Sequence, residues 1–385
     1  HRVHHAVNDH YLDRNYGGIL IIWDRLFGSF REEDEKCIYG TRSPLNSWDP
    51  LWSNTEVYWA LAKDSWHASN WGDKLRVWLK PPGWRPVDVT ARFPKPPFDI
   101  TRLERYHPPM SRALMWFGAV QFALLLLGVA LFLWYADGLP ALQSAVWLGA
   151  LATGLWAVGA ALQGRLTMTE VLLIEAAALA TATSALGLVE LHRVFKPLAL
   201  CFALVFVAAR ARPLRAAGRF DLYLLAGLAF SLAGDCFLMF QGFFIPGLLS
   251  FLVAHLFYIV LFKQGQAWFP SRRALAATLG VGALMYAVLF DGLSPVLRFA
   301  VAAYVIVIAL MAAQAIGRAT VLRDRASLGV ALGAGCFMLS DALLATNKFA
   351  QPLPMAQLWV LGTYYIAQIL IVHHARPVTS GRRDS

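Results

Sequence analysis

The chain alternates long apolar runs with short polar connectors from about residue 113 onward. The runs hold about 16 to 24 residues, close to the length that a helix needs to cross the hydrocarbon core of a bilayer. The ten runs are 113–135, 140–163, 169–189, 195–210, 221–240, 244–262, 274–290, 299–317, 326–346 and 354–374. The first 112 residues contain no run of that length. The pattern predicts an all-α polytopic membrane protein with about ten transmembrane helices and an N-terminal cytosolic or interfacial segment.

The composition supports a membrane protein and limits the kinds of partner that the chain can bind. Hydrophobic residues make up 58% of the 385 residues and charged residues only 15%, which excludes an ordinary water-soluble domain. The net charge of +10 does not indicate a nucleic-acid partner, because positive loops next to a membrane explain it. The four cysteines, Cys37, Cys201, Cys236 and Cys336, have neither metal-ligand spacing nor the pattern of a disulfide framework. We therefore expect a membrane and its lipids as partners, and no nucleic acid.

The basic connectors predict the orientation of the chain. If all ten runs span, nearly all basic residues of the connectors fall on one side, which the positive-inside rule makes cytosolic. The N-terminal segment and the C-terminus fall on that side too. Three solitary cations, Lys196, Arg298 and Lys348, lie on the opposite side. The cytosolic group comprises Arg165, Arg210, Arg212, Arg215, Arg219, Lys263, Arg272, Arg273, Arg318, Arg323, Arg325, Arg376, Arg382 and Arg383.

Tryptophans are concentrated between residues 48 and 84, among lysines, arginines and acidic residues. Indole rings favour the headgroup depth of a bilayer, so this stretch is typical of an interfacial segment. A surface on which nucleic-acid bases stack is the alternative interpretation. Prolines break regular structure from residue 80 to residue 97, which predicts an extended linker along the membrane surface.

The first residues form a histidine cluster. His1, His4 and His5 are spaced i, i+3 and i+4, which on a helix brings three imidazoles onto one face. Neutral imidazoles in that arrangement can bind iron or zinc. The alternative is a solvated or interfacial turn with no metal.

Residues 1–30, H-R-V-H-H-A-V-N-D-H-Y-L-D-R-N-Y-G-G-I-L-I-I-W-D-R-L-F-G-S-F, resemble the last histidine box of the fatty acid hydroxylase and sterol desaturase superfamily. The continuations E-K-C-I-Y-G, S-P-L-N-S-W-D-P and K-P-P-G-W-R-P are most similar to the alkylglycerol monooxygenases. The resemblance implies that His1, His4 and His5 are ligands of a di-iron centre and that the complete hydroxylase uses tetrahydrobiopterin. The family draws its ligands from three histidine boxes, so we expect this part alone to bind no iron and to be inactive as an oxygenase.

Two aspartates lie inside predicted membrane spans. Asp235 stands six residues before Gln241, and Asp341 stands six before Asn347, so both lie about 9 Å inside the same membrane surface at 1.5 Å per residue. A carboxylate at that depth is costly and marks a functional site by default. The matched depth predicts one shared site. The alternative is a structural role, in which each aspartate is hydrogen-bonded to neighbouring helices or paired with Lys196.

From about residue 169 to residue 376 the chain resembles the lysoplasmalogenase family, eight-helix membrane proteins that hydrolyse a vinyl-ether bond. The matching segments are K-P-L at 196–198, G-L-A-F-S-L-A-G-D-C-F-L-M at 227–239, F-L-V-A-H-L-F-Y at 251–258, S-D-A-L-L-A at 340–345 and T-Y-Y-I-A-Q at 363–368. The resemblance implies that Asp235 and Asp341 are catalytic, with no cofactor. It also implies that Lys196, His255, Tyr258, Tyr365 and Gln368 bind substrate, although a buried core role for His255 is an equal alternative.

The chemistry of the bond fits two carboxyl groups. An acid protonates the enol-ether carbon, water attacks the resulting oxocarbenium ion, and the hemiacetal collapses to an aldehyde and a glycerol lysophospholipid. Two carboxyl groups in different environments can divide the roles of acid and base. The sequence alone does not say which aspartate has which role.

Together, the two resemblances predict a bifunctional ether-lipid enzyme. Residues 1–112 are the end of a hydroxylase-like domain, 113–165 two transmembrane helices, 166–376 a lysoplasmalogenase-like domain and 377–385 a basic tail. Two alternatives stay open. One is a di-iron lipid hydroxylase whose C-terminal helices are accessory, and the other is a proton-coupled lipid transporter or scaffold.

Overall fold

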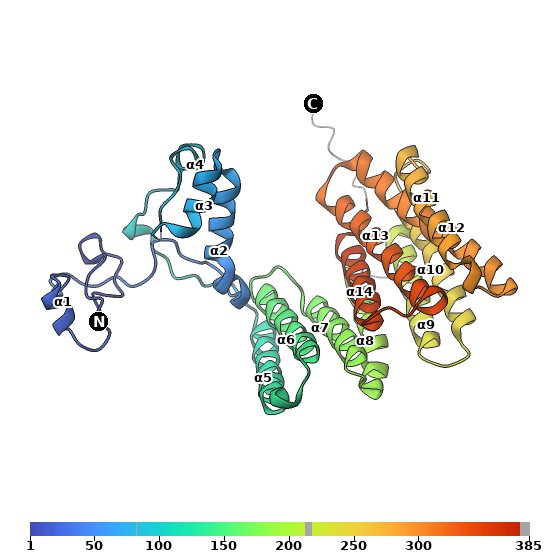
Figure 1. The fold of residues 1–385 in the computed structure, drawn as a ribbon, viewed down its shortest axis with the longest axis horizontal. Coiled ribbons are helices and arrows are strands. Elements are labelled where there is room, and N and C mark those ends of the chain that lie inside the picture. Colours follow the sequence, from blue (N-terminus) through green and yellow to red (C-terminus); the bar gives the residue numbers. More distant parts are fainter. Residues whose placement is uncertain (82, 212–217, 378–385) are drawn as a thin grey trace. The chain divides into compact units, whose positions relative to one another are not determined.

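The computed structural model describes residues 1–81, 83–211 and 218–377, and it divides into two compact units, His1–Ser111 and Arg112–Ser385 (Figure 1). Helices dominate both units, and the described residues contain no β-strand, only one isolated bridge between Ala6 and Tyr39. The all-α prediction is confirmed. Arg212, Arg215 and almost all of the predicted basic tail, with Arg382 and Arg383, lie outside the described residues.

The first unit begins with loops around two short helices, η1 (Asp9–Tyr11) and α1 (Ile22–Leu26). Asp24 organises these loops, because its carboxylate accepts hydrogen bonds from the Ser29 hydroxyl at 2.7 Å and from the amides of Tyr16 and Gly17 at 2.7 and 2.8 Å. The Ser29 hydroxyl, followed by the two amides, lowers the pKa of Asp24 below its usual value. The motif residues around Asp24 therefore have a structural role in the loop.

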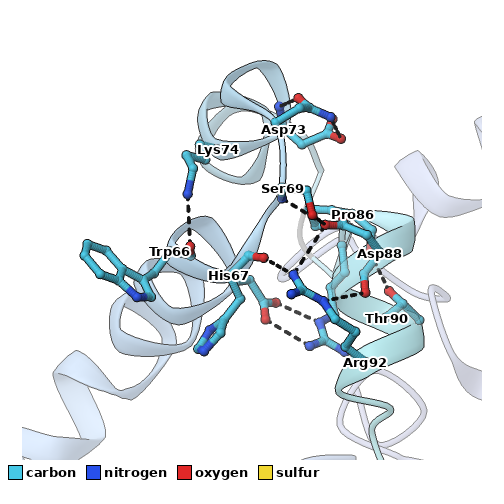
Figure 2. A network of polar contacts seen from close by, with 12 residues as sticks. Trp66, His67, Ser69, Asp73, Lys74, Pro86, Asp88, Thr90 and Arg92 are labelled. Atoms are coloured by element: carbon cyan, nitrogen blue, oxygen red, sulfur yellow. Dashed lines mark hydrogen bonds and ion pairs between the residues drawn. The ribbon is translucent and has the colours of Figure 1, made fainter.

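The rest of the first unit is built from α2 (Pro50–His67), α3 (Trp71–Leu79), α4 (Val87–Arg92) and η2 (Ile100–Arg102). The Arg85 guanidinium holds the Asp64 carboxylate in a two-bonded pair at 2.7 and 2.9 Å. Figure 2 shows the polar network beside it, in which Asp88 accepts hydrogen bonds from the amide and hydroxyl of Ser69 and Arg92 donates to the carbonyl of His67. These contacts tie α4 to the turn after α2. The interfacial placement of this segment stays a prediction.

The second unit contains ten long helices within the described residues: α5 (Arg112–Tyr135), α6 (Ala141–Leu162), α7 (Met168–Ala185), α8 (Val189–Arg210), α9 (Arg219–Leu238), α10 (Phe244–Lys263), α11 (Arg272–Leu289), α12 (Pro295–Leu322), α13 (Arg325–Ala345) and α14 (Ala356–His374) (Figure 1). Short turns follow α5, α11 and α13, namely η3 (Ala136–Gly138), η5 (Phe290–Gly292) and η6 (Thr346–Ala350). All ten helices are long and apolar enough to cross a membrane. The prediction of a polytopic membrane protein with about ten spans is confirmed.

A continuous core joins α7 to α10 and α12 to α14, with fully buried side chains that include Leu200, Leu228 and Phe337. Helices α9 and α10 approach closely because α9 has glycine where α10 presents aromatic rings. A Cβ atom at Gly227 would lie 2.6 Å from the Tyr258 ring, and one at Gly234 would lie 2.7 Å from the Phe251 ring. Any side chain there would force the helices apart. The close packing of Gly234 fixes the position of its neighbour, Asp235.

Helices α5 and α6 pack on α7 rather than standing alone. Their contact is an apolar cluster that includes Ala157, Val171 and Ile174. One polar contact crosses it, because the Gln121 amide of α5 donates to the Glu175 carboxylate of α7 at 2.7 Å. The division of the chain at residue 165 stays a prediction.

Short connectors make the loops alternate between the two ends of the bundle. The connectors after α6, α10 and α12 carry or adjoin basic residues and lie at one end, as the sequence predicted from Arg165, Lys263 and Arg323. Lys196 and Lys348 lie near the other end, in the first half of α8 and in η6. The cytosolic assignment of the basic end stays a prediction.

Candidate active site

A cavity of about 800 Å³ lies among the helices of the second unit, lined by residues of α8 to α14 and the end of α7. Both intramembrane aspartates line it, Asp235 from the last turn of α9 and Asp341 from the last turns of α13. The structure therefore brings together two side chains that lie about a hundred residues apart in the sequence. Their catalytic role stays a prediction.

Asp235 is held between a cation and a tyrosine. Its Oδ2 atom accepts a hydrogen bond from the hydroxyl of Tyr364 on α14 at 2.6 Å. Its Oδ1 atom lies 3.4 Å from the Nζ atom of Lys196 on α8. The Asp235 side chain is 3% exposed and that of Lys196 is 9% exposed. A buried carboxylate needs such partners, and the ammonium of Lys196 favours the ionised form of Asp235.

Asp341 has a different set of partners. Its Oδ2 atom accepts a hydrogen bond from the hydroxyl of Tyr304 on α12 at 2.5 Å, and the Nε2 atom of His255 on α10 lies 3.5 Å from the same oxygen. His255 Nε2 also lies 3.1 Å from the Tyr304 hydroxyl. Because Tyr304 donates its only proton to Asp341, the contact between His255 and Tyr304 requires a proton on Nε2. The Asp341 side chain is 19% exposed, so it is the more accessible carboxyl group.

Four of the residues predicted to bind substrate lie behind the cavity wall. The Tyr258 hydroxyl donates to Oε1 of Gln368 at 3.1 Å, and Nε2 of Gln368 donates to the Tyr364 hydroxyl at 3.4 Å. The Tyr365 hydroxyl donates to the carbonyl of Lys196 at 3.3 Å. Lys196 lines the cavity. The described lining residues do not include the other four, His255, Tyr258, Tyr365 and Gln368. Their hydrogen bonds reach Lys196 and the two tyrosines that contact the aspartates, and their part in substrate binding stays a prediction.

Those two tyrosines, Tyr304 and Tyr364, line the cavity and were not among the residues singled out from the sequence. The sequence could have identified Tyr364 as a site residue, because it stands four residues before Gln368 and so lies on the same face of the helix. Sequence reasoning chose the neighbouring Tyr365 instead. Tyr304 stands alone in the apolar run V-A-A-Y-V-I, where no local pattern separates it from a core aromatic residue.

The predicted metal ligands lie in the first unit. The structure forms a turn there rather than the expected helix, with the His5 amide donating to the His1 carbonyl at 3.3 Å. The imidazole centroids of His1, His4 and His5 are 4.7 to 6.5 Å apart. Within the described ranges no group of three or more His, Cys, Asp or Glu side chains is arranged to hold a metal ion. The three histidines in this arrangement do not fit a di-iron centre.

The fold and the cavity define a polytopic α-helical membrane protein with a polar site inside its helix bundle. Comparison with protein families assigns the bundle more closely. Residues 191–375, from α8 to the end of α14, match the model of the YhhN family. No solved structure gives a significant match.

Two kinds of curated relative are similar to the chain. An alkylglycerol monooxygenase of Xenopus tropicalis is 38% identical over 127 residues, which cover 33% of this chain and 28% of the relative. The lysoplasmalogenase TMEM86A of Homo sapiens is 36% identical over 153 residues, which cover 38% of this chain and 62% of the relative. Both names that the sequence motifs suggested therefore occur among the relatives. The chain spans under a third of the monooxygenase and under two thirds of the lysoplasmalogenase.

Proposed function

We propose that the second unit is a membrane enzyme that acts on ether lipids and hydrolyses the vinyl-ether bond of lysoplasmalogens, yielding an aldehyde and a glycerol lysophospholipid. The observation that carries this proposal is the pair of carboxyl groups, Asp235 and Asp341, in one cavity inside the helix bundle. The names of the lysoplasmalogenase relatives support the same reaction. The reaction needs a proton donor and a base, and two carboxyl groups in different surroundings can provide both.

We infer the roles of the two aspartates from their surroundings. Asp341 is proposed as the acid, because it is the more exposed carboxyl group and no described residue hydrogen-bonds its Oδ1 atom, while Oδ2 accepts from Tyr304. Asp235 is proposed as the base, because the Lys196 ammonium 3.4 Å away offsets part of the cost of burying a carboxylate there. Asp341 protonates the enol-ether carbon that is not bonded to oxygen. Asp235, being ionised, then stabilises the oxocarbenium ion and accepts a proton from the attacking water.

The second half of the reaction returns both protons. The hemiacetal hydroxyl gives its proton to the Asp341 carboxylate as the aldehyde carbonyl forms. Asp235, now protonated, gives its proton to the departing glycerol oxygen as the carbon–oxygen bond breaks. Asp341 is then protonated and Asp235 ionised, as at the start, so the cycle balances.

The apolar part of the cavity suits the hydrocarbon chain of such a substrate. Its walls include Leu284 and Met285 of α11, Val305 of α12, and Met338 and Leu339 of α13. A volume of about 800 Å³ lies within the usual range for small-molecule sites. The cavity therefore has a polar centre and an apolar extension, as an amphiphilic lipid requires.

The direct test of this function is aldehyde release by the purified chain in lipid nanodiscs. We expect release from a 1-alkenyl lysophospholipid and none from the 1-alkyl ether of the same length, because only the alkenyl ether forms an oxocarbenium ion on protonation. Failure to release aldehyde from either lipid would contradict the proposal. Lipid flux driven by a pH gradient, without aldehyde, would favour the transporter alternative.

Removing the hydroxyl of Tyr304 or Tyr364 is expected to lower kcat. In Tyr304→Phe and Tyr364→Phe each aspartate loses a hydrogen bond, and bonds to charged groups contribute about 1.5 to 3 kcal/mol, which corresponds to roughly 10- to 100-fold in rate. The matched control is Tyr286→Phe, whose hydroxyl donates to the Arg298 carbonyl at 3.2 Å and does not touch either aspartate. Steady-state kinetics of aldehyde release compare the three. Equal rates in all three variants would exclude a catalytic part for the tyrosines.

We also propose that the first unit is related to the hydroxylases of the alkylglycerol monooxygenase kind. The similarity to alkylglycerol monooxygenases supports this.

A further inference from the structure

The charged side chains that line the cavity are not evenly distributed. The two carboxylates lie inside the bundle, each with the partners already described. At the helix ends on the same side, the described lining residues include the cations Arg193 and Lys348 and the imidazole of His192, but no carboxylate. We call these three residues the basic end of the cavity.

The partners of the two cations leave both able to bind an anion. Arg193 contacts Glu190 at 2.8 Å, but the Glu190 side chain is 83% exposed, and such surface pairs are weak. The Lys348 ammonium lies 4.5 Å from the centroid of the Phe244 ring, and no described carboxylate lies within ion-pair distance of it. His192 is oriented by a contact of 2.9 Å between its Nδ1 atom and the Ala180 carbonyl.

The basic end lies outward from the aspartates. Arg193 precedes Lys196 by three residues on α8, which places it about 4.5 Å nearer the helix end, and Lys196 is level with Asp235 through their contact. Lys348 belongs to η6, the turn that follows α13 beyond Asp341. The cavity is thus lined by cations at the bundle end, by the two carboxyl groups and by apolar side chains of α11 and α12.

These three kinds of lining side chain match the three parts of a single-chain glycerophospholipid, namely its phosphate, its glycerol ether and its hydrocarbon chain. Resting on the function proposed above, we propose that Arg193 and Lys348 bind the phosphate of the lipid headgroup and so set the position of the ether bond. A three-carbon glycerol unit separates that phosphate from the ether oxygen. With the phosphate at the basic end and the chain against α11 and α12, the alkenyl bond comes to the aspartates. Arginine is well suited to phosphate, because its fork can donate two parallel hydrogen bonds.

The subsite predicts selectivity for phosphorylated lipids. A 1-alkenylglycerol has the same reactive bond but no phosphate. It should therefore bind more weakly than the phosphorylated lipid, and neither cation should contribute to its affinity. Because the phosphate contact is present before and during the reaction, loss of a cation should raise KM and leave kcat nearly unchanged. This split distinguishes a binding cation from one that only stabilises the fold.

The test uses binding as well as kinetics. Arg193→Gln, Lys348→Gln and the double variant are compared with Arg273→Gln, which changes an exposed arginine at the opposite end of the bundle. The probes are the non-cleavable 1-alkyl-glycero-3-phosphocholine and 1-alkylglycerol, with binding to the full chain in nanodiscs measured by titration. We expect each cavity variant to raise Kd for the phospholipid about tenfold, the equivalent of 1.4 kcal/mol. The Kd for alkylglycerol should stay within about twofold, and Arg273→Gln should change neither.

The possible results distinguish a lipid-phosphate subsite from a free-phosphate site, and they also distinguish failure of the subsite from failure of the proposed hydrolysis. Equal losses for both probes, or no loss for either, would overturn the subsite. Displacement of the phospholipid by inorganic phosphate, with equal Kd values for the two probes, would identify a free-phosphate site and also overturn it. Selective phospholipid binding that depends on Arg193 and Lys348, in a parent protein that releases no aldehyde, would support the subsite while contradicting the proposed hydrolysis.

Discussion

Asp341→Asn and Asp235→Asn are each expected to lower kcat for aldehyde release by about 10²- to 10⁴-fold, the usual contribution of a positioned acid or base. The asparagine of the first variant has no proton of sufficient acidity to transfer to carbon. The asparagine of the second cannot accept a proton from water or stabilise a cation. Both variants keep a hydrogen-bond acceptor for Tyr304 or Tyr364, so the packing around the site should change little.

The chain offers a matched control for these substitutions. Glu175 is a third carboxyl group inside a membrane span, but it pairs with Gln121 between α7 and α5 and does not line the cavity. Glu175→Gln should therefore retain nearly the parental kcat. The measurement is the initial rate of aldehyde formation at saturating lysoplasmalogen, with folding checked by thermal denaturation. If the aspartate variants matched Glu175→Gln in rate, the acid–base assignment would be wrong.

Lys196→Met is expected to have the largest effect on stability. Lys196 and Asp235 form a buried pair at 3.4 Å, and removing one partner of such a pair typically costs about 3 to 5 kcal/mol, because it leaves the other charge uncompensated. Methionine preserves most of the side-chain volume, so lost packing contributes little. The measurement is the free energy of unfolding in detergent, compared with that of the parent protein.

A double variant separates charge from packing. In Lys196→Met with Asp235→Asn no unpaired charge remains, so most of the lost stability should return, while aldehyde release should stay at the level of Asp235→Asn alone. The interaction energy from this double-mutant cycle measures the coupling of the pair. Additive losses in the cycle would show that Lys196 does not interact with Asp235 in the folded protein.

The sequence predicted the number of spans but not all of their ends. Hydropathy placed one helix from residue 195 and let the preceding one run to residue 189, whereas α7 ends at Ala185 and α8 begins at Val189. The break is invisible to hydropathy because L-G-L is apolar, and Gly187 ends the helix by adopting a φ of 73°. The first turns of α8 carry Glu190, His192 and Arg193, which hydropathy excludes from a span although they are helical.

The sequence predicts which side chains share a depth in the membrane, but it does not predict which side chains meet through the packing of helices. The alternation of helices puts Asp235 and Asp341 at one depth, and the structure brings both to one cavity. The contact of Tyr304 with Asp341 depends on how α12 packs against α13 and α10, which no local sequence pattern encodes. The same packing places His255, Tyr258 and Gln368 behind the wall of the cavity. The three N-terminal histidines form a turn because a single turn does not pay the cost of helix nucleation.

Protonation of carbon is the central claim of the mechanism, and deuterium reports it directly. We would let the purified protein cleave a 1-alkenyl lysophospholipid in D₂O, reduce the aldehyde at once with borohydride and measure its mass. The account predicts one deuterium on the carbon next to the former carbonyl, because the acid that protonates the enol ether exchanges with solvent. An aldehyde of full length without deuterium at that carbon would contradict the account.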